Sequence, residues 1–226
     1  MRKTNFAILA LCLALASPLF AQKKEDERLA NSARVLQAIT GEKGVPVPIL
    51  QEAACVAVYP SVKKVAVGIG GSYGRGVLVC RKGAKMDGPW GAPAMYSLDT
   101  ASLGVQLGSS ATDYVLVVLS NDAAETVIKG KTKLGSNASV AAGPTGATAA
   151  GFSPQATILT YSRTKGVFAG VSLAGASVDD DKDANKNLYG KEMSAQEIVT
   201  GETAVPTSGE ALVSFLQKTA PTRNTI

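Results

Sequence analysis

The spacing of apolar residues changes from a helical period to a strand-like one near residue 55. Over 23–39, Leu29, Ala33 and Leu36 recur at helical intervals, which predicts an amphipathic helix. From 55 to about 173, short runs rich in Val, Ile, Leu, Tyr and Thr are bounded by Gly, Pro, Ser or Asp, which predicts β-strands. Helical spacing returns after Ser194, which forms a capping box with Glu197.

The strand-like runs follow one another at intervals of about ten residues, which favours an antiparallel sheet that is curved or closed into a barrel. We expect strands near 55–59, 65–69, 76–80, 94–98, 103–107, 113–119, 133–141, 156–162 and 167–173. We expect helices at 23–39, 48–54, 121–129, 194–199 and 207–219, and a polar loop at 179–186. The predicted fold is therefore α+β, a curved antiparallel sheet or barrel-like core flanked by amino-terminal and carboxy-terminal helices.

The first 21 residues have the pattern of a secretory signal peptide. Arg2 and Lys3 precede an apolar run over 6–20, and Ala21 is a suitable last residue before cleavage. We therefore expect export, to the periplasm or the cell envelope if the host is Gram-negative. Residues 22–220 are expected to form a single domain and 221–226 a loose tail.

The basic residues gather in two stretches that contain no acid. After residue 53 and before residue 86 there are six Lys or Arg, and the stretch between Thr126 and Val178 also lacks acids. If 55–59, 65–69 and 76–80 form a meander, two basic turns share one end of the sheet, where they would attract an anionic membrane. The first candidate patch is Lys63, Lys64, Arg81, Lys82 and Lys85, and the second is Lys129, Lys131, Arg163 and Lys165. The simpler alternative is a set of ordinary solvated lysines in turns.

Two cysteines follow the predicted leader, Cys55 and Cys80. In an exported chain they favour a disulfide, and two buried thiols are the alternative. The meander conflicts with the disulfide, because its first and third strands would lie almost 10 Å apart at a strand spacing of about 4.8 Å. We give the disulfide more weight than the strand order.

Several motifs of enzymes and metal sites are incomplete. The segment 70–74 matches the G-x-S-x-G elbow around Ser72, but the chain has no histidine for a catalytic triad. The segment 181–192 matches part of a calcium-binding EF-hand loop, but Lys186 stands where the loop needs glycine. We therefore expect no enzyme activity, no cofactor and no metal site, and the calcium alternative stays open.

Several blocks of the chain together resemble one known family. They are "PSVKKVAVGIGGSYGRGVLVCR" (60–81), "GPWGAPAMYSL" (88–98), "SLGVQLGSSATDYVLVVLSNDAAETVI" (102–128), "KLGSNASVAAGPTG" (133–146), "LTYSRTKGVFAGVSLAGASV" (159–178) and "NLYGKEMSAQEIV" (187–199). In order and spacing they resemble the SYLF family of lipid-binding domains. The resemblance implies non-catalytic binding of anionic phospholipid, often phosphoinositide in eukaryotic relatives, some of which also engage actin.

The basic residues are our candidates for contact with lipid headgroups. The competing interpretation is a structural or interaction protein of the envelope with a protein or glycan partner. We expect no nucleic-acid partner. The sequence leaves the particular lipid and the oligomeric state open.

Overall fold

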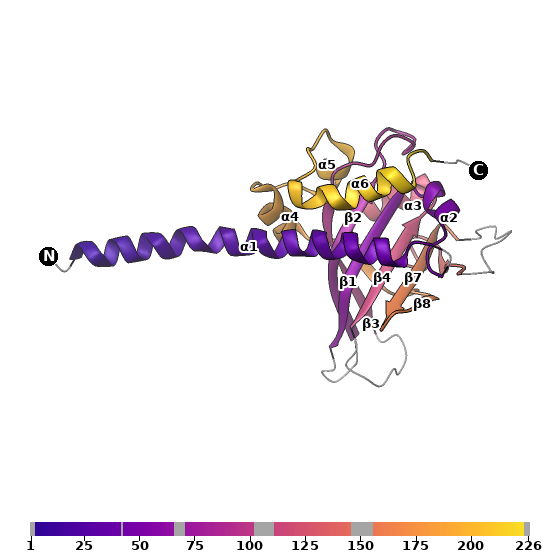
Figure 1. Ribbon diagram of the computed structural model, residues 1–226, viewed down its shortest axis with the longest axis horizontal. Coiled ribbons are helices and arrows are strands. Elements are labelled where there is room, and N and C mark those ends of the chain that lie inside the picture. The colour runs from indigo at the N-terminus through magenta and orange to yellow at the C-terminus, as the bar shows by residue number, and fades with distance from the viewer. Residues whose placement is uncertain (1–2, 42, 66–70, 102–110, 146–155, 224–226) are drawn as a thin grey trace.

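A computed structural model of the chain describes residues 3–41, 43–65, 71–101, 111–145 and 156–223 (Figure 1). The helices are α1 (Lys3–Ile39), α2 (Val47–Glu52), α3 (Asn121–Ile128), α4 (Lys182–Tyr189), α5 (Ala195–Thr200) and α6 (Glu210–Thr219), with a 3-10 turn, η2 (Thr207–Gly209), before α6. The strands are β1 (Cys55–Val65), β2 (Gly71–Cys80), β3 (Ala94–Ala101), β4 (Thr112–Val118), β5 (Thr132–Lys133), β6 (Val140–Ala142), β7 (Ile158–Thr164), β8 (Val167–Gly170) and β9 (Ser177–Asp180).

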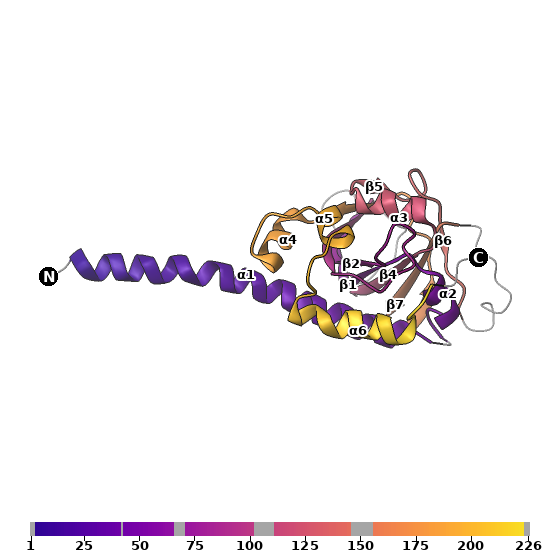
Figure 2. The ribbon, with the colours of Figure 1, turned by 90° about the horizontal axis from the view of Figure 1, so that it is seen from above.

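The strands of the described residues form one sheet in the order β5-β9-β3-β2-β1-β4-β7-β6, and β8 also pairs with β7, on the edge away from β4. All of these pairs are antiparallel except β6 with β7. The sheet curls strongly into a half-barrel, which is clearest from above (Figure 2). The prediction of an α+β fold with a curved antiparallel sheet and helices at both ends of the chain is confirmed.

Both faces of the sheet are apolar, because successive residues of a strand point to opposite sides. In β1, Val56 and Val58 face one cluster of buried side chains, and Cys55, Ala57 and Tyr59 face the other. Helices α1, α2 and α6 cover the outer face, where α1 and α6 lie side by side. Helices α3 and α5 pack over the concave face (Figure 2). The strands therefore read as continuous apolar runs in the sequence.

The first hairpin resolves the conflict between the disulfide and the strand order. The predicted strand 55–59 belongs to β1, which continues to Val65, and most of the predicted strand 65–69 lies outside the described residues. Cys55 and Cys80 are therefore direct partners on adjacent antiparallel strands, and they form a disulfide with their Cα atoms 4.0 Å apart. The disulfide is therefore confirmed. The three-stranded meander is wrong, because β1 continues beyond Pro60 through a bulge, in which Ser61 has φ 50°.

Other predicted elements need correction. The segment 179–186 is not a polar loop, because β9 and α4 occupy it. Asp181 caps the amino end of α4, and the buried Asn185 side chain bonds to the backbone of Met95, so 181–192 does not form an EF-hand loop. The predicted strand 133–141 is replaced by the short strands β5 and β6. The predicted strand 103–107 lies outside the described residues.

Helix α1 attaches to the sheet by its carboxy-terminal half, where Leu29 and Leu36 are fully buried. Its amino-terminal half extends away from the sheet (Figure 1). The buried Glu25 forms an ion pair with Arg28 at the start of the attached half. Among the residues that the structure describes, no helix is long and apolar enough to span a membrane.

The buried side chain of Arg81 binds the carboxy-terminal segment 220–222, and we call this arrangement the Arg81 clasp. The Arg81 side chain is only 2% exposed, and its guanidinium stacks on Trp90 at 4.4 Å from the ring centre. The backbone carbonyls that accept its hydrogen bonds, at 2.8–3.3 Å, belong to Ala53, Gly88, Ala220, Pro221 and Thr222. Arg223 bonds in turn to the carbonyls of Glu52, Lys85, Met86 and Leu119 and to the Asn121 side chain. Residues 221–223 are therefore held in place, contrary to the prediction of a loose tail.

We expect Arg81→Met to lower the free energy of unfolding by about 3 kcal/mol. Hydrogen bonds to a charged group contribute about 1.5–3 kcal/mol each, and the substitution leaves buried carbonyls without a donor. Urea unfolding followed by circular dichroism measures the difference. Lys85→Met, an exposed change in the same loop, is the control and should stay within about 0.5 kcal/mol of the unchanged protein. Equal stability of Arg81→Met and the unchanged protein would contradict the role of this clasp.

Glu25 predicts a pH dependence of stability. Burial raises the pKa of its carboxyl and Asp181 adds to the rise, while Arg28 and Arg75 oppose it. A raised folded-state pKa stabilises the fold at low pH, and this contribution is lost as the pH rises through that pKa. The free energy of unfolding of Glu25→Gln should therefore increase relative to that of the unchanged protein between pH 4 and pH 7. Urea titrations at both pH values test this, with the exposed Glu27→Gln as the control. A difference that does not change with pH would refute it.

Candidate functional site

The predicted basic residues lie at two opposite ends of the sheet. Lys63 and Lys64 stand where β1 ends, whereas Arg81, Lys82 and Lys85 follow the other end of the β1–β2 hairpin. The second predicted patch is divided between the same two ends. Arg163 and Lys165 lie at the end that carries Lys63, whereas Lys129 and Lys131 follow α3, at the end that carries Arg81. The two predicted patches are therefore wrong as groups, because the strands that connect them run the full length of the sheet.

Arg81 is not a surface residue at all. Its guanidinium is enclosed by the backbone carbonyls of the carboxy-terminal segment, and burial together with Arg223 lowers its pKa to about 10. It cannot reach a membrane headgroup in this fold, so its assignment to a lipid-contact surface is corrected. Its hydrogen bonds hold the carboxy-terminal segment instead.

We call the end of the sheet near Lys63 the tip, and we define it by five of the described residues, Lys63, Tyr73, Arg163, Lys165 and Val167. Lys63 is the direct partner of Tyr73 across β1 and β2, so their side chains share one face. Lys165 and Gly166 form the turn between β7 and β8, with φ 49° and 80°, as in a two-residue type I′ hairpin. Since β2, β1, β4, β7 and β8 are consecutive neighbours, the tip spans about 19 Å at about 4.8 Å per strand.

The tip combines apolar and basic side chains. In the described residues Tyr73 and Val167 are the exposed large apolar side chains, at 41% and 69%. Within the same part of the chain, no ion pair involves Lys63 or Lys165. Sequence reasoning missed both apolar residues, although Tyr73 interrupts a run of glycines and Val167 directly follows a Lys-Gly pair.

Acidic groups reduce the charge of the tip. Asp113 pairs with Arg163 at 2.7 Å and also accepts a hydrogen bond from the backbone of Ser61. Asp99 lies across from Tyr73 on β3, and burial, with Asp179 nearby, raises the pKa of its carboxyl. Lys63 and Lys165 are thus the two basic side chains of the described tip that have no ion-pair partner within the described residues.

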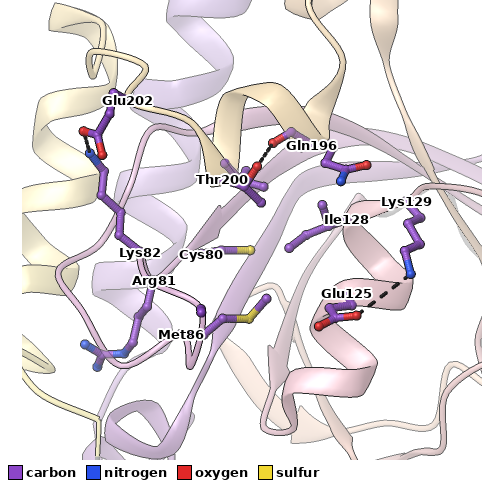
Figure 3. Close-up of a pocket in the computed structure, with 13 residues that line it drawn as sticks. Cys80, Arg81, Lys82, Met86, Glu125, Ile128, Lys129, Gln196, Thr200 and Glu202 are labelled. Carbon is purple, nitrogen blue, oxygen red and sulfur yellow. Dashed lines mark hydrogen bonds and ion pairs between the residues drawn. The ribbon is translucent and has the colours of Figure 1, made fainter.

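A pocket of about 450 Å³ opens at the opposite end of the sheet, between the end of β2, α3 and α5 (Figure 3). We call it the end pocket. Its lining residues are Cys80, Arg81, Lys82, Gly83, Ala84, Met86, Glu125, Ile128, Lys129, Gln196, Val199, Thr200 and Glu202. It brings together residues from both predicted basic patches, with Lys82 on one side and Lys129 on the other.

Each lysine at the rim of the end pocket has a carboxylate partner. Lys82 Nζ lies 3.2 Å from Glu202, and Lys129 Nζ lies 3.9 Å from Glu125. Lys85 and Lys131 are exposed nearby in sequence but do not line the pocket. The pocket is therefore a mixed-charge site rather than a cationic one.

The described residues do not complete the enzyme motif that the sequence matches in part. Ser72 of the G-x-S-x-G match lies within β2, paired with Thr100 of β3, and the strand continues after it. Within the described ranges, no three side chains of His, Cys, Asp or Glu come together as a metal site would require.

Comparison with known proteins identifies relatives over most of the chain. Residues 99–219 match a family model described as "Ysc84: Las17-binding protein actin regulator". An SH3 domain-containing protein of Schizosaccharomyces pombe is 32% identical over 200 residues, which cover 86% of this chain and 46% of that protein. LAS seventeen-binding protein 3 of Saccharomyces cerevisiae is 31% identical over 204 residues, covering 88% of this chain and 44% of the relative.

The human SH3 domain-containing YSC84-like protein 1 is 30% identical over 202 residues, 86% of this chain and 58% of that protein. The chain thus spans about half the length of the curated relatives it matches, and one of the three is named as a binding protein. No solved structure gives a significant match. The matched family model and these relatives agree with the resemblance in the sequence: the chain belongs to the Ysc84, or SYLF, domain family.

Proposed function

We propose that this protein is a non-catalytic module that binds the surface of anionic phospholipid membranes through its tip. The observation that carries the proposal is that the exposed Tyr73 and Val167 lie at one end of the sheet with Lys63 and Lys165, which form no ion pair with any described residue. Apolar side chains that enter the headgroup region and lysines that pair with phosphates are the two components of peripheral membrane binding. Phosphoinositide-like headgroups are one form of such a surface.

Each component of the tip has a separate physical role. A basic residue close to an anionic membrane contributes about 1 kcal/mol, and salt screens that contribution. Burial of apolar surface contributes about 25 cal/mol per Å² and is much less sensitive to salt. With two uncompensated lysines the electrostatic part is modest, so the apolar part is needed for stable attachment.

A protein partner is the alternative function. The matched family model and one relative of this chain are named for binding Las17. In that case the exposed Tyr73 and Val167 would contact a protein surface, since exposed apolar residues also mark such interfaces. A partner in the cell envelope, protein or glycan, would then replace the membrane.

Export is part of the proposal. Residues 1–21 have the composition of a signal peptide, and the Cys55–Cys80 disulfide is the form that cysteines take in an oxidising compartment. We place the mature protein in the periplasm or attached to the cell envelope.

Charge reversal at the tip tests the membrane proposal. We expect Lys63→Glu/Lys165→Glu to weaken binding to vesicles of phosphatidylcholine and phosphatidylglycerol by about 30-fold, equivalent to the loss of about 1 kcal/mol per lysine. Co-sedimentation at low and high salt measures the affinity. The matched control is Lys182→Glu/Lys191→Glu, which makes the same charge change at exposed sites away from the tip and should bind normally.

A second variant tests the apolar component. Val167→Ser should weaken vesicle binding at low and high salt alike, because it removes apolar contact without changing charge. Absence of binding to any vesicle, or equal losses in the tip and control double variants, would overturn the membrane proposal and favour the protein partner.

Export predicts a defined amino terminus. When the full chain is expressed in a Gram-negative bacterium, the periplasmic fraction should contain a protein that begins at Gln22 and has an intact disulfide, as measured by mass spectrometry with and without reductant. Ala21→Arg should block cleavage, because the residue before the cut must be small. An uncleaved, reduced chain in the cytoplasm would contradict export.

A further inference from the structure

We infer that the end pocket is a second binding site, for a small amphiphile with a zwitterionic head group of one phosphate and one ammonium, as in phosphatidylethanolamine. Two ion pairs stand on opposite sides of the mouth, Lys82–Glu202 and Lys129–Glu125, and the floor between them is apolar (Figure 3). The site lies at the opposite end of the sheet from the tip, so the inference does not rest on the proposed membrane binding.

The charge of the rim favours a ligand that is neutral overall. Two lysines and two glutamates line the mouth, and the fifth charged residue, Arg81, directs its guanidinium to the carbonyls of the carboxy-terminal segment. A ligand that carries only negative charge would meet both carboxylates, and a simple cation would meet both ammonium groups. A ligand with both charges can place its phosphate near the lysines and its ammonium near the glutamates.

The existing ion pairs are easy to exchange. Glu202 is 95% exposed, the Lys129 and Glu125 side chains are also mostly exposed, and the Lys129–Glu125 contact is long at 3.9 Å. Ion pairs of this kind are weak because water solvates both partners. A ligand that offers each group a new partner therefore gains more than it disrupts.

The floor of the pocket requires an apolar part of the ligand. Cys80, Met86 and Val199 are buried beneath the mouth, together with Ile128 of α3. A volume of about 450 Å³ exceeds what a phosphoethanolamine group alone would fill, and it lies within the range of about 300–1,000 Å³ typical of small-molecule sites. The floor can hold a glycerol group and the first carbons of an acyl chain, which points to an aminophospholipid.

The walls of the pocket are held firmly. The disulfide fixes Cys80 to β1, the Arg81 clasp fixes the loop that follows, and the Ser194–Glu197 capping box fixes the start of α5. A site on rigid elements loses little conformational entropy on binding, which favours a pre-formed ligand site.

Titration with soluble short-chain lipids, followed by calorimetry, tests the inference. Dihexanoyl phosphatidylethanolamine, kept below its micelle concentration, should bind at least tenfold more tightly than dihexanoyl phosphatidic acid or dihexanoyl phosphatidylglycerol. Glu125→Gln/Glu202→Gln should weaken binding of the ethanolamine lipid at least tenfold. The matched control, Glu27→Gln/Glu210→Gln, changes exposed glutamates outside the pocket and should bind normally.

Two further comparisons separate this site from the tip and identify the source of the ligand. The tip variant Lys63→Glu/Lys165→Glu should bind the soluble lipid normally even where it fails to bind vesicles. Glycerophosphoethanolamine, which keeps the neutral head group but has no acyl chain, should bind more weakly than the lipid, because it leaves most of the apolar floor empty. Equal affinity for the two would overturn the lipid as the ligand, and a preference for phosphatidic acid or an unchanged affinity in the glutamate variant would overturn the site.

Discussion

The structure depends on one constraint: a sheet that is apolar on both faces must be covered on both. Val56 and Val58 of β1 can be buried only if α1 and α6 lie on the outer face, and Ala57 and Tyr59 only if α3 and α5 cover the concave one. Burial of these side chains is the main favourable term in folding. Because helices occupy both faces, the two ends of the sheet remain for contact with other molecules. The tip and the end pocket are at those ends.

The fold class followed from local patterns, and strand order did not. The apolar runs located most strands, and Ser194 with Glu197 located the start of α5. The sequence prediction divided β1 into two strands at Pro60. A bulge that lets one strand continue beyond a proline has no clear sequence signal. The segment 179–186 appeared to be a loop because its side chains are polar. Its order comes from Asn185, whose amide bonds to the distant backbone of Met95.

The candidate surface was less predictable than the fold. Basic residues that are close in sequence stand at opposite ends of the sheet, since a strand of ten residues separates them by its full length. The buried guanidinium of Arg81 donates hydrogen bonds to carbonyls about 140 residues later in the chain. No local sequence pattern indicates hydrogen-bond acceptors that are so distant in the chain. Conversely, the tip includes Tyr73 and Val167, which composition alone assigns to the core.

The arginine clasp also governs the order in which the chain can finish folding. The carbonyls of 220–222 that surround the Arg81 guanidinium are synthesised after nearly every other residue of the domain. Until these residues leave the ribosome, Arg81 lacks its carboxy-terminal acceptors, and Trp90 lacks the Ala220 carbonyl that accepts its indole N–H. Because synthesis is vectorial, the clasp closes late in the folding of the domain, after the sheet that carries Arg81 has been made.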